Sequence, residues 1–265
     1  MTLSNAPRGE FYRDVVDRCI PDRNSTILIV CGGESDRRLF LELGFTRVTI
    51  TNLNPQGRTE AFHPFDFARQ DAENLRLEDE SFDFVVVNAG LHHCAAPHRA
   101  LLEMYRVARL GAIVVEARDS VVMRAATRLK LTTAYEVYPV TLGSTGLRDT
   151  DSPNYVYRWT EREVRKTVAS YAPHVRNRIR FFYGLSLPAG DDSSAAARAK
   201  QMLVRAAAPI AKVMFRVLPS QGNLFGFCIT KPDLPGDLQS WMELDGGRPR
   251  FRMALRKPSA EGSTR

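Results

Sequence analysis

Two adjacent glycines, Gly32 and Gly33, follow directly after an aliphatic run at residues 27–30. The run has no polar alternation, which is typical of a parallel strand buried on both faces. A helix is expected over residues 36–43, so the backbone N–H groups of the glycine turn should lie beside a helix N-terminus, where anionic groups bind. The sequence therefore predicts a ligand site here. The turn lacks the third glycine of the G-x-G-x-x-G motif of nicotinamide enzymes, and on its own it fits any strand-to-helix turn.

Two adjacent histidines, His92 and His93, follow a second aliphatic strand expected at residues 83–88. An unperturbed imidazole titrates near pH ~6.5, so either ring could act as a general base for a substrate hydroxyl. His92 is the preferred candidate because it comes nearer the strand end. The alternative is that both rings are structural, packing at the strand end and bonding to the backbone.

Two acidic residues, Glu116 and Asp119, stand near the end of a further strand at residues 112–117. Asp119 and Glu116 are alternative bases, or they orient a histidine; a surface ion pair with Arg118 is the non-catalytic alternative. The four cysteines are far apart and form no CxxC pair. No cluster with the spacing of metal ligands is evident, and we expect no metal site.

The elements that position these residues alternate between strand and helix. Strands are expected at 27–31, 48–52, 66–69, 83–88 and 112–117, and helices at 36–43 and 97–109. This rhythm predicts a mainly parallel, doubly wound sheet, whose ligands bind outside the carboxyl ends of the strands.

The flanking segments add further helices and strands. Apolar residues at helical spacing predict a short N-terminal helix that ends near Pro21 and docks on the domain surface. Helices are also expected near 120–131, at 160–172 after a capping box of Thr160 and Glu163, and within 190–217, where Pro209 breaks or kinks the helix. Strands are expected at 179–183 and 224–230.

Composition places the chain among ordinary globular proteins, with 265 residues, 44% of them hydrophobic and 25% charged. The N-terminus lacks the apolar core of a signal peptide, and no run approaches the ~18 apolar residues of a membrane-spanning helix. We therefore expect a cytoplasmic protein. A homodimer is left open as its assembly. The formal net charge of +7 permits nucleic acid or an anionic membrane surface as a partner.

Residues 26–118 resemble the class I methyltransferases that use S-adenosylmethionine, in particular the small-molecule branch called methyltransferase type 11. Gly32 and Gly33 match the family's glycine-rich motif. Asn52, at the end of the second strand, stands where relatives have an acidic residue that binds the ribose hydroxyls. An amide oxygen can still accept one hydroxyl hydrogen bond, but without the charge.

The segments around residues 70–85 and 88–93 carry the more specific part of the resemblance. In relatives the aspartate at the position of Asp71 binds the adenine amino group, and the next backbone N–H meets a ring nitrogen. The segment 88–93, with its Leu-His-His pattern, lies where relatives hold the transferable methyl group. The resemblance thus implies S-adenosylmethionine as cofactor, bound by residues Cys31, Gly32, Gly33, Asn52, Leu53, Asp71, Ala72, Asn88 and Ala89.

A polar and aromatic segment after residue 152 is the candidate acceptor site. Asn154, Tyr155, Tyr157 and Arg158 could contact a sugar, an acid or a phosphate. The Asn/Asp-Pro-Pro-aromatic motif of nucleobase amino-methyltransferases is absent from residues 88–93. The sequence therefore disfavours a nucleic-acid acceptor despite the charge, and we expect a small-molecule acceptor.

The resemblance implies a Rossmann-like class I methyltransferase fold, α/β, with a seven-stranded mainly parallel sheet, an antiparallel last strand and helical and loop insertions. One domain is expected over 1–265, with its parts at 1–25 (leader), 26–118 (cofactor-binding core), 119–158 and 190–217 (substrate-side insertions) and 246–265 (basic flexible tail). The expected reaction is O-methylation of a sugar or secondary metabolite with a His or Asp base. An RNA or protein methyltransferase, or a non-catalytic binding protein on this fold, are the alternatives.

Overall fold

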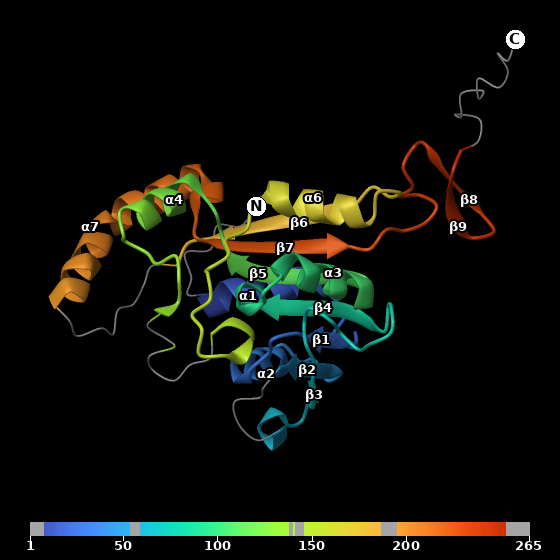
Figure 1. The fold of residues 1–265 in the computed structure, drawn as a ribbon, viewed down its shortest axis with the longest axis horizontal. Helices are drawn as coiled ribbons and strands as arrows, with labels where there is room; N and C mark the ends of the chain where they lie inside the picture. The colour runs from blue at the N-terminus through green and yellow to red at the C-terminus, as the bar shows by residue number, and fades with distance from the viewer. Residues whose placement is uncertain (1–7, 54–58, 138–139, 141–145, 187–194, 253–265) are drawn as a thin grey trace, which may run out of the picture.

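A seven-stranded sheet forms the centre of the molecule (Figure 1), in the strand order β3-β2-β1-β4-β5-β7-β6. The computed structural model describes residues 8–53, 59–137, 140, 146–186 and 195–252. The strands of the sheet are β1 (Ile27–Ile29), β2 (Val48–Asn52), β3 (Asp66–Arg69), β4 (Phe82–Asn88), β5 (Ala108–Ala117), β6 (Arg178–Gly184) and β7 (Leu224–Thr230).

The directions of the strands are those of the class I methyltransferase fold that the sequence predicts. Strands β1 to β5 pair in parallel, whereas β7 is antiparallel to both of its neighbours, β5 and β6. The apolar run that predicts β1 explains its central place, because all three of its residues are fully buried. The expected seven-stranded sheet with an antiparallel last strand is confirmed.

Helices cover both faces of the sheet, and each face has its own apolar core. Helices α1 (Arg8–Cys19) and α2 (Glu34–Glu42) pack on one face, and α3 (Pro97–Val107) and α6 (Glu161–Tyr171) on the other. Helix α1 buries Phe11, Val15 and Val16 against the sheet, as expected for a helix docked on the domain surface. The predicted capping box of Thr160 and Glu163 begins α6.

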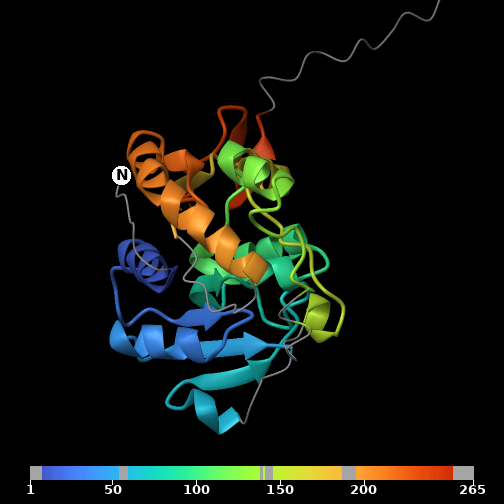
Figure 2. The same ribbon diagram turned by 90° about the vertical axis from the view of Figure 1, so that its left-hand side faces the viewer.

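Two further helices, α4 (Val121–Arg128) and α7 (Ala195–Val217), lie beyond the end of the sheet at which β4 ends, the end that faces the viewer in Figure 2. The described residues also form four short 3-10 helices: η1 (Thr59–Phe62), η2 (Leu91–His93), η3 (Leu147–Asp149) and η4 (Pro219–Gln221). None of the described helices is both long and apolar enough to cross a membrane.

Helix α7 continues through Pro209, so of the two expected effects of this proline the break does not occur. One sequence expectation differs from the structure. The expected flexible tail at 246–265 begins instead with a hairpin of β8 (Met242–Asp245) and β9 (Arg248–Phe251). Gly246 and Gly247 have φ of 56° and 81°, and two left-handed residues are what a two-residue hairpin turn requires. Residues 253–265 lie outside the described part of the chain.

Candidate active site

A cavity of about 620 Å³ opens at the carboxyl ends of β1, β2 and β4. Parallel strands end at the same edge of the sheet, so segments far apart in sequence converge there. All nine residues that the sequence assigns to the cofactor line this cavity: Cys31, Gly32, Gly33, Asn52, Leu53, Asp71, Ala72, Asn88 and Ala89. Its volume lies within the range of about 300–1,000 Å³ that is usual for small-molecule and cofactor sites.

The two glycines of the turn after β1 have different surroundings. A Cβ atom at Gly32 would lie 2.7 Å from Ile50 Cγ2 and 2.8 Å from Ile29 Cγ2, so the turn packs tightly on β1 and β2. A Cβ atom at Gly33 would meet nothing within 4 Å. Gly32 therefore serves the packing of the turn, whereas Gly33 leaves room beside the cavity that it lines.

A buried carboxylate, Asp36, occupies the start of α2. Its Oδ2 accepts a hydrogen bond from the Gly33 N–H at 2.9 Å, and its Oδ1 accepts one from the Tyr12 hydroxyl at 3.0 Å. Burial raises the pKa of Asp36. The predicted anion-binding site at the N-terminus of α2 is therefore partly occupied, because one N–H group of the turn already donates to an acidic residue of the chain.

Asn52 and Leu53 hold the turn from the side of β2. The Asn52 amide donates to the Gly32 carbonyl at 3.1 Å, and its oxygen accepts from the Leu53 N–H at 2.8 Å. Asn52 thus braces the glycine turn through its own amide as well as lining the cavity.

The cavity is also lined by an arginine that the sequence analysis does not single out. Arg148, in η3, forms a 2.8 Å ion pair with Asp71 Oδ2 and lies 3.7 Å from Glu73. The Glu73 N–H donates to the other oxygen of Asp71 at 2.9 Å. Both carboxylate oxygens of the predicted adenine-binding residue therefore have partners within the chain.

The two histidines have different environments. His92 is buried, and its Nδ1 donates to Glu116 Oε2 at 2.9 Å, while the other oxygen of Glu116 accepts from the Leu91 N–H. His93 lines the cavity, and its Nδ1 lies 3.4 Å from the Gly146 carbonyl. The sequence favours His92 as the base, but the histidine that reaches the cavity is His93.

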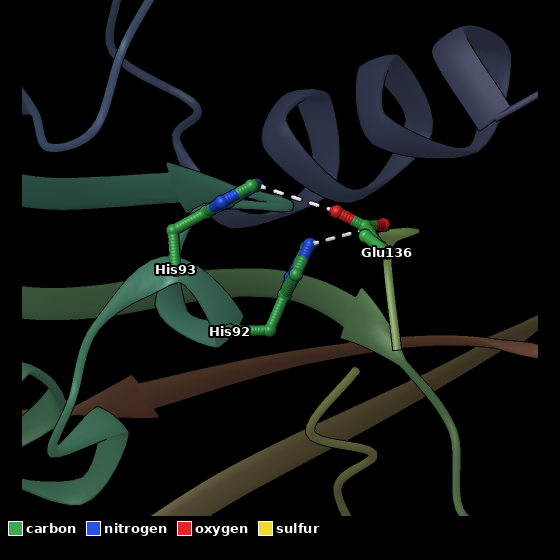
Figure 3. A group of neighbouring side chains, drawn as sticks. All are labelled: His92, His93 and Glu136. Atoms are coloured by element: carbon green, nitrogen blue, oxygen red, sulfur yellow. Dashed lines mark ion pairs between the residues drawn. The ribbon is translucent and has the colours of Figure 1, made fainter. Parts of the chain in front are cut away.

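A carboxylate from the first insertion, Glu136, faces both histidines (Figure 3). Glu136 Oε1 lies 3.7 Å from His92 Nε2, and Oε2 lies 3.8 Å from His93 Nε2. Sequence analysis misses Glu136, because only the path of the insertion brings it to η2. With it the three side chains offer possible metal-ligand atoms that all lie within 4.8 Å of one another, a cluster that the sequence does not reveal.

The charges of this cluster shift its pKa values. Burial disfavours the imidazolium of His92, but the charge of Glu116, the hydrogen bond to it and the nearby charge of Glu136 raise the pKa of His92 to about 10. Burial and the neighbouring His92 lower the pKa of His93. The neighbouring His92, 3.7 Å away, is the main cause that lowers the pKa of Glu136 to about 2.

The predicted acceptor residues divide into two places. Tyr155, Tyr157 and Arg158 line a separate hollow of about 380 Å³, together with Asp119. Asp119 pairs there with Arg124 and does not line the cavity that holds His93. Asn154 lies elsewhere: it is buried, and its amide Nδ2 donates to Glu136 Oε2 at 3.3 Å.

The residues present fit a nucleoside cofactor. Asn88 lines the cavity, and its buried Oδ1 has no hydrogen-bond partner among the described residues, so a bound ligand could donate to it. Glu34 and Ser35 line the cavity at the start of α2, where the first N–H groups of a helix have no intrahelical partner. The site thus offers backbone donors for a carboxylate and an amide acceptor for a donor group.

Comparisons with known proteins agree with this fold and site. Residues 28–115 match the family described as Methyltransferase domain. No curated protein sequence gives a significant match. The YcgJ protein from Bacillus subtilis has a similar fold, with a TM-score of 0.54 and 12% identity over 84% of this chain and 99% of that chain.

A second similar structure is a phosphoethanolamine N-methyltransferase 2 from Haemonchus contortus, solved with phosphomonomethylethanolamine and S-adenosylhomocysteine. Its TM-score is 0.50, with 13% identity over 84% of this chain and 53% of that chain. At such identities the neighbours show the fold alone. Residues 28–115 thus match a methyltransferase domain, and the strand order of the whole sheet is that of the class I methyltransferase fold.

Proposed function

We propose that this protein is an S-adenosylmethionine-dependent methyltransferase and that it methylates a hydroxyl of a small molecule, such as a sugar or a secondary metabolite. The observation that carries the proposal is the position of His93, which lines the cofactor cavity and faces Glu136 at 3.8 Å. Imidazole and carboxylate groups accept protons, and a hydroxyl must lose its proton when its oxygen is methylated.

We further propose how the cavity residues hold the cofactor. Asp71 and the Ala72 N–H would bind the adenine, and Asn52 the ribose, through the hydrogen-bond capacity that its backbone contacts leave free. The methionine carboxylate would bind near Gly33 at the N-terminus of α2. The opposite end of the cavity, lined by Asn88, Ala89 and His93, would then lie beside the acceptor.

The protein's task in this reaction is orientation and proton removal. When bound, S-adenosylmethionine supplies an activated methyl group on a sulfonium, so no residue of the chain has to form a covalent intermediate. Positioning of two reactants contributes ~7–11 kcal/mol to such reactions. The cluster of His92, His93 and Glu136 provides the acceptor atoms for the hydroxyl proton. Asp119 has no part in the proposed proton removal, because it lines a different hollow.

The absence of the Asn/Asp-Pro-Pro-aromatic motif at residues 88–93 supports a hydroxyl over a nucleobase amine. The test is transfer of a deuterated methyl group from S-adenosylmethionine to a panel of phenols, sugars, amines and RNA, followed by mass spectrometry. Products among the phenols or sugars are expected. Products among the amines or RNA alone would refute the hydroxyl acceptor.

The role of the cluster has its own test. His93→Ala is expected to lower turnover by ~10²–10⁴-fold while binding of S-adenosylhomocysteine, followed by calorimetry, is retained. His63→Ala is the matched control, because His63 is exposed and does not line the cavity. If His92→Ala and His93→Ala both keep full turnover, the cluster does not take part in proton removal.

A further inference from the structure

We propose that His92, His93 and Glu136 together bind one divalent transition-metal cation beside the cofactor cavity. The acceptor hydroxyl would be a further ligand, a part that rests on the proposed function. The three side chains come from η2 and from the first insertion, and both rings point toward the same carboxylate (Figure 3).

The spacing of the ligand atoms suits a cation. Bonds from zinc to imidazole nitrogen and carboxylate oxygen are about 2.0–2.2 Å, which places neighbouring ligand atoms about 3–3.5 Å apart. Here the Nε2 atoms of His92 and His93 lie 3.7 and 3.8 Å from the oxygens of Glu136, and the three ligand positions are within 4.8 Å of one another. Small side-chain shifts would close this distance.

The outer hydrogen bonds orient both rings for ligation. His92 Nδ1 is bonded to the buried Glu116 at 2.9 Å, and His93 Nδ1 approaches the Gly146 carbonyl at 3.4 Å. An Nδ1–H that donates outward leaves the Nε2 lone pair facing inward. Metal-bound histidines have this arrangement, with a carboxylate or backbone carbonyl on the second ring nitrogen.

The carboxylates of Glu116 and Glu136 also favour a positive charge at the centre of the cluster. When both rings are neutral and both Nδ1–H groups donate outward, two nitrogen lone pairs and one carboxylate converge there and none of them donates. Glu116 and Glu136 carry two formal negative charges at this place. One proton on His92 would balance one of them, whereas a divalent cation balances both. A proton is therefore the competing occupant.

A buried amide beside the cluster gives an independent indication of a ligand. Asn154 is 1% exposed, and its Nδ2 donates to Glu136. Its Oδ1 is buried and has no hydrogen-bond partner among the residues that the structure describes. A water or hydroxyl bound to the cation would supply the missing donor.

The identity of the ligands narrows the choice of cation. Imidazole suits Zn²⁺, Fe²⁺, Co²⁺ and Ni²⁺, whereas Mg²⁺ and Ca²⁺ prefer oxygen ligands. Three protein ligands leave at least one position open in a catalytic site. His93 and Glu136 have side chains that are 36% and 30% exposed, so the cluster is accessible from the cavity side, which His93 lines.

The cation would make proton removal easier. In this metal-bound form the lone pairs of His93 and Glu136 hold the cation, so a bound hydroxyl would lose its proton to solvent water and not to the cluster, because a cation lowers the pKa of a bound oxygen acid. The resulting oxygen would form a bond to the methyl carbon as the sulfur–methyl bond breaks, and S-adenosylhomocysteine would leave.

The test uses the full chain freed of metal with a chelator and then titrated with Co²⁺, followed by visible absorption, and with Zn²⁺, followed by calorimetry. One equivalent of each is expected to bind. Glu136→Gln and His93→Asn should weaken binding at least tenfold, and Glu116→Gln should weaken it ~10–100-fold through the orientation of His92. His63→Ala and His174→Ala should leave it unchanged.

Zinc is also expected to raise the unfolding temperature of the wild type but not that of Glu136→Gln. A cooperative unfolding transition of Glu136→Gln without zinc shows that this variant folds. No binding by the wild type, or binding lost only in the His63 and His174 variants, would overturn the site and leave a proton as its occupant. Methyl transfer that persists in chelator would overturn the hydroxyl ligation alone. Failure to bind S-adenosylmethionine would overturn the proposed function while the metal titration still reports on the site.

Discussion

An added side chain should affect the stability of the fold differently at the two glycines of the turn after β1. At Gly32 an added methyl group would meet the buried side chains of Ile29 and Ile50 at 2.8 and 2.7 Å. Overpacking of this kind costs ~1–3 kcal/mol. At Gly33 the same methyl group meets nothing within 4 Å, and φ of −143° is open to any residue. Gly33→Ala should therefore change the stability by less than ~1 kcal/mol, because the lower entropy of the unfolded chain is opposed by the poorer N-cap that alanine makes for α2.

Cofactor binding should show the reverse order. Gly33 lines the cavity, so a larger side chain there fills space that the cofactor needs. Gly33→Leu is expected to weaken S-adenosylhomocysteine binding at least 100-fold, about 2.7 kcal/mol, with the fold intact. Urea denaturation measures the stability of Gly32→Ala, Gly33→Ala and Gly33→Leu, and calorimetry measures their affinity.

Two results would refute this reasoning. Wild-type affinity in Gly33→Leu would mean that the cofactor does not approach the turn. Wild-type stability in Gly32→Ala would mean that the turn is not packed on β1 and β2 as described.

Three other predictions concern separate parts of the molecule. Asp71→Ala should weaken S-adenosylhomocysteine binding at least tenfold by calorimetry, whereas Asp79→Ala, an exposed control, should not; equal affinities would contradict the adenine assignment. Trp159→Ala should lower the free energy of unfolding in urea by ~3–5 kcal/mol, because Trp159 is fully buried, and a loss below ~1 kcal/mol would contradict its core role. Burial raises the pKa of Asp36, so its contribution to stability is present below the ordinary value and is lost as the pH rises through the raised value; Asp36→Asn should remove that pH dependence from denaturation curves, and an unchanged dependence would contradict it.

The sheet and the cofactor cavity could be predicted because their signals are local. The aliphatic run of β1 has no polar residue, which indicates burial on both faces, and each predicted strand ends where a turn residue follows. Cavity residues such as Gly33, Asn52 and Asn88 follow or end parallel strands, and these ends must meet at one edge of the sheet.

Other parts of the site depend on packing that leaves no local pattern. Arg148 meets Asp71 across 77 residues, from an insertion whose path the sequence does not define. Glu136 reaches the histidines in the same way. The Tyr12 hydroxyl meets Asp36 only because α1 docks beside α2. The C-terminal hairpin was predicted as a tail because two glycines are as typical of a loop as of a tight turn.

A crystal structure with S-adenosylhomocysteine tests the central claim most directly, namely that the cavity at the ends of β1, β2 and β4 binds the cofactor. We predict a ligand whose adenine lies beside Asp71 and Ala72, whose amino-acid end lies beside Gly33, and whose sulfur lies nearer to His93 than to Asp71. A ligand bound in the hollow of Tyr155 and Arg158, or no binding at millimolar concentration, would contradict it.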